Sequence, residues 1–159
     1  MKILKNIIIL IILFSVQGLQ TLANVNESAF IEKGNAFLNK ALSNQNPELN
    51  AIYLNKAQYF FYVASQNNPP SSEAFIGLGR VYILKDKQDE AKDAMFRAYS
   101  IDTYSANANF YLAQYYFNYN DFISALKYYE NAKNLGYKNT SENDKMIEIC
   151  KSKLGDTDN

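Results

Sequence analysis

The chain has 159 residues, with 16 basic and 16 acidic side chains, no histidine and one cysteine. These counts exclude Ser-His-Asp and Cys-His catalytic sets, HExxH zinc sites, Cys-based zinc sites and intramolecular disulfides. The zero formal net charge argues against a nucleic-acid-binding protein, which is expected to be basic. Only three prolines and six glycines occur in a chain that is 48% hydrophobic, which favours one domain built of long helices.

The first 23 residues have the pattern of a secretory signal peptide. Lys2 and Lys5 precede an unbroken apolar run, Ile7–Phe14, which is too short to cross a bilayer. A polar stretch follows and ends in small residues up to Ala23, as signal peptidase requires. We therefore expect cleavage after Ala23.

Cleavage would place the mature protein in the periplasm or outside the cell. Two alternatives stay open at this stage. Residues 3–16 could remain as an N-terminal membrane anchor, or they could form a buried helix of the fold.

From residue 57 onward the sequence repeats with a period of 34 residues. Each of three blocks contains an alanine, a bulky residue four positions later and a second alanine three positions further on, which is one face of a helix. The matching positions are Ala57, Phe61 and Ala64; Ala91, Met95 and Ala98; Ala125, Tyr129 and Ala132. Before the second and third blocks, Leu78 with Tyr82 and Leu112 with Tyr116 predict a preceding helix.

This pattern resembles the tetratricopeptide repeat (TPR), whose 34-residue unit is a pair of helices. The second and third repeats match at Phe75, Leu78, Gly79, Tyr82, Ala91, Met95 and Ala98, and at Leu112, Ala113, Tyr116, Asp121, Phe122, Ala125, Tyr129 and Ala132. The resemblance implies an all-α, right-handed α-solenoid of about three helix pairs, and it implies that Gly79 allows close helix packing. The first repeat is atypical, because about eleven residues are inserted around 38–50.

A map of the elements follows from these patterns. We expect helices over 27–43 and 49–66, 72–85 and 89–101, and 105–118 and 122–135, within a TPR domain over 24–154 and repeats over 27–71, 72–105 and 106–139. A seventh helix over 141–154 should cap the exposed apolar side of the last repeat, with Ser141 and Asp144 as its capping box. Residues 155–159 are expected to form a tail.

No residue set in the chain predicts catalysis, a metal or a cofactor. Cys150 is interpreted as a small buried apolar side chain. The acidic group at Asp86, Asp89, Glu90 and Asp93 lacks the calcium-loop pattern and is interleaved with lysines, which indicates a solvated turn. An enzyme that acts on a glycan with paired carboxylates is a third hypothesis, behind the two non-enzymatic ones given below. It is the least favoured, because the acidic residues fall at helix ends and exposed turns.

In TPR proteins the first helix of each pair lines a concave groove. The resemblance places there Glu73, Ile76, Arg80, Ile83 and Leu84, then Asn107, Phe110, Gln114, Phe117 and Asn118, with Ile31, Asn35 and Leu38 from the first repeat. This lining mixes apolar and amide side chains with one arginine, unlike the co-chaperone type, which clamps a carboxylate with several basic residues. The Tyr- and Phe-rich third repeat should also bring some rings to the surface.

The leading hypothesis is an exported, non-enzymatic scaffold that binds a protein or peptide in this groove. The alternative is a structural or assembly subunit of an envelope or secretion complex, which uses its terminal faces or self-association. No nucleic acid partner is expected, and membrane contact is expected only through an uncleaved N-terminal segment. The oligomeric state stays open.

Overall fold

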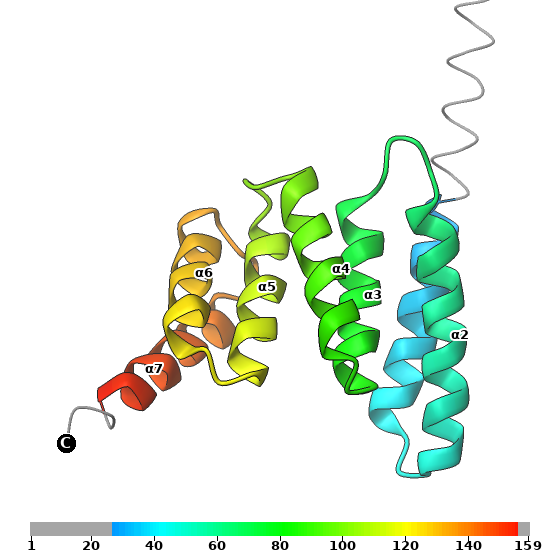
Figure 1. The fold of residues 1–159 in the computed structure, drawn as a ribbon, viewed down its shortest axis with the longest axis horizontal. Helices are drawn as coiled ribbons and strands as arrows, with labels where there is room; N and C mark the ends of the chain where they lie inside the picture. Colours follow the sequence, from blue (N-terminus) through cyan, green and yellow to red (C-terminus); the bar gives the residue numbers. More distant parts are fainter. Residues whose placement is uncertain (1–26, 156–159) are drawn as a thin grey trace, which may run out of the picture.

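The computed structural model describes residues 27–155, and this part of the chain is an all-α array of seven helices. A first helix spans 27–43 and is followed by α2 (Pro47–Ser65), α3 (Ser72–Leu84), α4 (Gln88–Ile101), α5 (Ala106–Asn118), α6 (Phe122–Asn134) and α7 (Thr140–Gly155). Figure 1 shows the helix pairs side by side in a row, with the first pair at one end and α7 at the other. The predicted signal peptide and residues 156–159 of the predicted tail lie outside the described residues.

The 34-residue pattern forms the core, as the sequence predicts. All six repeat alanines are 0% exposed, and the three bulky residues between them are at most 1% exposed. The small residues let neighbouring helices approach, and Phe61, Met95 and Tyr129 fill the space between them. Among the described residues, no helix is both long and apolar enough to cross a membrane.

Glycines in the first helix of a pair allow close packing on the second. A Cβ added at Gly34 would lie 2.7 Å from the ring of Phe61, and one added at Gly77 would meet the same ring. At Gly79 an added Cβ would lie 2.6 Å from Cε of Met95, which confirms the predicted packing role of this glycine. These distances are far inside van der Waals contact, so a larger residue would require the Phe61 ring or the end of the Met95 side chain to move.

Three helices end in the same way, with a left-handed residue after the helix. These residues are Asp86 (φ 53°), Asn120 (φ 62°) and Gly136 (φ 80°). After each of them the next backbone N–H donates to a carbonyl five residues earlier, for example Lys87 N to Tyr82 O at 2.9 Å. This is the Schellman motif, in which Asn is tolerated and Gly is preferred.

The inserted residues of the first repeat lengthen its two helices. The helix over 27–43 and α2 are joined by residues 44–46 alone, and both are longer than any helix of α3–α6. α2 begins at Pro47, two residues before the predicted position 49. The side chain of Asn46 accepts hydrogen bonds from the backbone N–H groups of Glu48 and Leu49, and Pro47 occupies the first turn, where it needs no hydrogen-bond donor.

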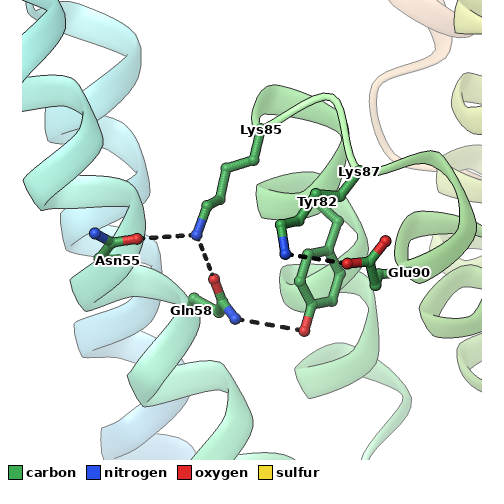
Figure 2. Close-up of polar contacts among 6 residues, drawn as sticks. All are labelled: Asn55, Gln58, Tyr82, Lys85, Lys87 and Glu90. Carbon is green, nitrogen blue, oxygen red and sulfur yellow. Dashed lines mark hydrogen bonds and ion pairs between the residues drawn. The ribbon is translucent and has the colours of Figure 1, made fainter.

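A polar cluster ties the end of α3 to α2 (Figure 2). The ammonium of Lys85 donates to Oδ1 of Asn55 at 2.9 Å and to Oε1 of Gln58 at 2.6 Å. Gln58 in turn donates to the hydroxyl of Tyr82 at 3.5 Å. Partial burial, and then the nearby charge of Lys87, lower the pKa of Lys85. This cluster adds polar contacts to the apolar core that the first helix pair shares with α3.

The cap helix α7 covers the last repeat, but its N-terminal cap differs from the prediction. Asn139 accepts from the backbone N–H of Glu142 and donates to that residue's carboxylate at 2.7 Å. The helix therefore begins at Thr140, and the predicted Ser141–Asp144 capping box is wrong. Asp144 lies one turn further on, where it pairs with Lys133 of α6 at 2.9 Å.

Candidate peptide-binding groove

The first helices of the three pairs share one surface, which contains two adjoining hollows. The smaller hollow has a volume of about 220 Å³ and is lined by Ile31, Asn35, Glu73, Ile76, Gly77, Arg80, Asn107 and Tyr111. These residues come from the helix over 27–43, from α3 and from α5. The lining is mixed, with amide groups and one acid beside apolar side chains.

The larger hollow, about 280 Å³, continues the same surface toward α7. Its lining is mostly apolar and consists of Leu42, Arg80, Ile83, Leu84, Gln114, Phe117, Asn118, Tyr129 and Met146. Leu42 and Leu84 are 56% and 45% exposed, so they can contact a partner without any change in the core. Because α7 contributes Met146, the cap helix also forms part of the wall.

Arg80 belongs to both hollows and is the only cationic residue in either lining. Its guanidinium lies over the ring of Tyr111, 5.0 Å from the ring centroid. Such a contact orients the charge and leaves the edge of the guanidinium for an acceptor. Arg80 is therefore the natural polar anchor of the groove.

An aromatic cluster supports the tyrosine under Arg80. Tyr137 stacks on Phe110 with ring centroids 4.0 Å apart, and Phe110 meets Tyr111 edge to face at 5.3 Å. Burial raises the pKa of the Tyr137 hydroxyl, and the neighbouring Tyr111 raises it further. The Tyr137 phenol therefore stays neutral at physiological pH and gives Arg80 no counter-charge.

Eleven of the thirteen predicted groove residues line the two hollows: Ile31, Asn35, Glu73, Ile76, Arg80, Ile83, Leu84, Asn107, Gln114, Phe117 and Asn118. Their role in binding stays a prediction. Phe110 is different, because it is 1% exposed and is covered by Tyr137 and Tyr129. Leu38, placed in the groove from the weaker first repeat, is 0% exposed and also belongs to the core.

Sequence reasoning missed Leu42, Gly77, Tyr111, Tyr129 and Met146 as lining residues. Helical spacing could have found Tyr111, which lies four residues after Asn107 and three before Gln114 on one face. The position of Met146 depends on how α7 packs, which no repeat pattern encodes.

The other residues singled out in the sequence lie away from the groove. Cys150 is 0% exposed, and burial raises the pKa of its thiol, so the reactive thiolate is disfavoured. In the acidic group, Glu90 pairs with Lys87 at 3.0 Å and Asp93 with Arg97 at 2.9 Å. A hollow of about 600 Å³ beside Arg97 is larger than either groove hollow, but it lies between α2, α3 and α4 and shares no residue with the groove.

No protein-family model and no curated protein sequence matches the chain. Solved structures do match. TTC0263, a thermophilic TPR protein of Thermus thermophilus, is similar with a TM-score of 0.68 and 20% identity over 80% of this chain. The chain has the tetratricopeptide repeat fold.

A second structure with this fold similarity is MamA AMB-1. It matches with a TM-score of 0.52 and 14% identity, over 86% of this chain and 84% of that one. The match to TTC0263 covers 63% of the Thermus protein, so our chain spans less than two thirds of its length. At these identities the likeness establishes the TPR fold, and function must be argued from the groove itself.

Proposed function

We propose that the protein is a non-enzymatic scaffold whose groove binds a peptide or an extended segment of a protein partner. The observation that carries this proposal is the meeting of two hollows at Arg80, which gives one continuous surface across five helices. Apolar side chains surround a single oriented cation on this surface, a combination that suits a peptide better than a small charged metabolite.

The lining also favours a particular kind of segment. Apolar side chains of the partner would bury Leu42, Leu84 and Phe117 in the larger hollow. A carboxylate or carbonyl of the partner would accept from Arg80, and backbone groups would pair with amides such as Asn35 and Gln114.

We further propose that this binding takes place outside the cytoplasm. Support comes from the sequence, where Lys2 and Lys5 precede the short apolar run Ile7–Phe14 in a signal-peptide pattern. The partner would then be a component of the cell envelope or an exported protein.

Affinity capture from the source organism's own cell envelope tests the groove. The variant Leu42→Ser/Leu84→Ser changes two exposed side chains of the larger hollow. It should lower recovery of the partner at least about tenfold, because each leucine buries apolar surface only in the complex. Sequencing the N-terminus of the captured protein tests cleavage before Asn24.

Ile123→Ser is the matched control, because Ile123 is 72% exposed on α6 and lies outside both hollows. It should leave recovery unchanged. Equal recovery by the wild type and the double variant, with the fold intact by circular dichroism, would contradict the groove assignment.

A further inference from the structure

The outer side of the first helix pair carries a ladder of aromatic rings. Phe30 stacks on Phe60 with centroids 6.2 Å apart, Phe60 on Phe37 at 5.6 Å, and Phe37 on Tyr53 at 6.3 Å. All four rings are partly exposed, and among the described residues their ring-to-ring contacts stay within this pair. The ladder lies in the first pair, at the end of the row opposite α7 (Figure 1).

Other large apolar side chains of α2 are also exposed, and one of them, Tyr59, meets Phe60 edge to face at 5.4 Å. Leu49, Ile52, Tyr59 and Tyr62 are 40%, 47%, 61% and 55% exposed. No other helix among α2–α7 has as many large exposed apolar side chains in the described part of the chain. An apolar surface of this kind, concentrated on one helix pair, marks a contact site.

Three lysines lie over the ladder. The ammonium of Lys33 is 5.8 Å from the ring centroid of Phe60, and those of Lys40 and Lys56 are each 5.3 Å from that of Phe37. None of the three forms an ion pair within residues 27–155. We call the four rings and these three lysines the N-terminal face.

The opposite end of the array shows how such a face is covered. There α7 buries Ile147 and Cys150 against the last repeat. A single amphipathic helix can therefore cover the apolar side of a terminal helix pair. The outer side of α7 is polar, with Lys145, Glu148 and Lys151 exposed. Head-to-tail stacking of two copies would therefore press the N-terminal face onto a polar helix.

Charge also argues against two partners of the N-terminal face that this protein could itself supply, namely a second copy of the chain and residues 1–26. Face-to-face pairing of two copies would bring together six lysines, because within residues 27–155 the acids of the same helix pair (Glu27, Glu32 and Glu48) form no ion pair with these lysines. Residues 1–26 carry Lys2 and Lys5 and no acidic residue, so they do not complement this face either. An acidic partner is the one that neutralises the lysines.

We propose that the N-terminal face is a second docking surface, separate from the groove, for an amphipathic helix of a partner protein. This helix carries acidic side chains beside an apolar stripe. The apolar side chains of this helix cover the four rings. Its carboxylates pair with Lys33, Lys40 and Lys56, whose contacts with the rings become buried in the complex.

Two synthetic helical peptides test this surface by fluorescence anisotropy. They share one leucine face, and their polar faces carry glutamates in one and lysines in the other. The acidic peptide should bind the purified protein at least about tenfold more tightly, and added salt should weaken the binding because it screens surface charge. Lys33→Gln/Lys40→Gln/Lys56→Gln should remove this preference.

Lys127→Gln/Lys145→Gln/Lys153→Gln is the control, since it removes the same charge from positions elsewhere on the molecule. It should retain the preference, and so should Leu42→Ser/Leu84→Ser, which separates this test from that of the groove. Equal binding of both peptides, binding of neither, or a dimer seen by light scattering that Ile52→Ser/Tyr59→Ser dissolves would overturn the proposal.

Discussion

Single residues of the repeat decide how close its helices come. Ala57, Ala91 and Ala125 are fully buried. A larger side chain at any of these positions would therefore meet the neighbouring helix. Tyr129 is an exception to simple packing. Its ring fills the position held by Phe61 and Met95 in the other repeats, but its hydroxyl is buried without a hydrogen-bond partner among the described residues.

Tyr129→Phe should stabilise the protein. A buried hydroxyl without a partner costs about 1–3 kcal/mol, and phenylalanine keeps the ring contacts with Phe110. The free energy of unfolding, from urea denaturation, should rise by about 1 kcal/mol. Tyr104→Phe, at a position that is 81% exposed, is the control and should have no effect. A loss of stability in Tyr129→Phe would mean that the hydroxyl is hydrogen-bonded in solution.

The helices lie close to the positions predicted from the sequence. Their exact ends depend on which residues cap them. Three helix ends use Asp86, Asn120 or Gly136 in the left-handed region, at the turns expected from the repeat. The start of α7 was less predictable, because Asn139, Thr140 and Ser141 are all good N-cap residues. In the structure Asn139 forms the cap, while Asp144 pairs with Lys133 on α6, a contact that sequence spacing does not encode.

The cap of α7 can be tested by a matched pair of variants. Asn139→Ala should lower the free energy of unfolding by about 0.5–2 kcal/mol, because it removes the bonds to both the backbone and the side chain of Glu142. Ser141→Ala should change it by less than about 0.5 kcal/mol, because Ser141 is exposed within the helix. The reverse order of the two effects in denaturant titrations would restore Ser141 as the cap.

The whole molecule is a row with two different ends and one groove. α7 closes the last repeat and contributes Met146 to the larger hollow, so one helix serves both stability and the binding surface. The first pair has no such cover within residues 27–155, and its rings and lysines remain accessible. The core is also rich in phenols, which gives the fold as a whole a pH dependence.

The protein should lose stability at alkaline pH. Burial is the main cause that raises the pKa of Tyr115, Tyr116, Tyr128, Tyr129 and Tyr137 above the ordinary value of about 10. The unfolded chain therefore releases these protons first, so their contribution is fully present below about pH 10 and is lost above it. The lowered pKa of Lys85 acts in the opposite direction, but it is a single group, whereas burial also raises the pKa of Tyr119 and of the Cys150 thiol.

Urea titrations at rising pH, followed by circular dichroism and tyrosinate absorbance, measure this effect. The midpoint should fall above about pH 10, and the buried phenols should ionise together with unfolding. A midpoint that stays constant to about pH 11, with all tyrosines ionising in the folded protein, would contradict the proposed burial.

The repeat period, the helix pairs and the buried alanine stripes were determined by the sequence alone, because a helix face must recur every three or four residues to be buried. The resemblance to the tetratricopeptide repeat predicted Arg80 and Gln114 on the groove surface. Tertiary structure alone decided that Phe110 is core, since Tyr137, which covers it, is distant in sequence and arrives through the turn before α7. It also decided that Leu42 and Met146 share one hollow and that the lysines of the first pair lie over its rings. These features arise where separate helices meet, and the periodicity of a single helix carries no information about its neighbours.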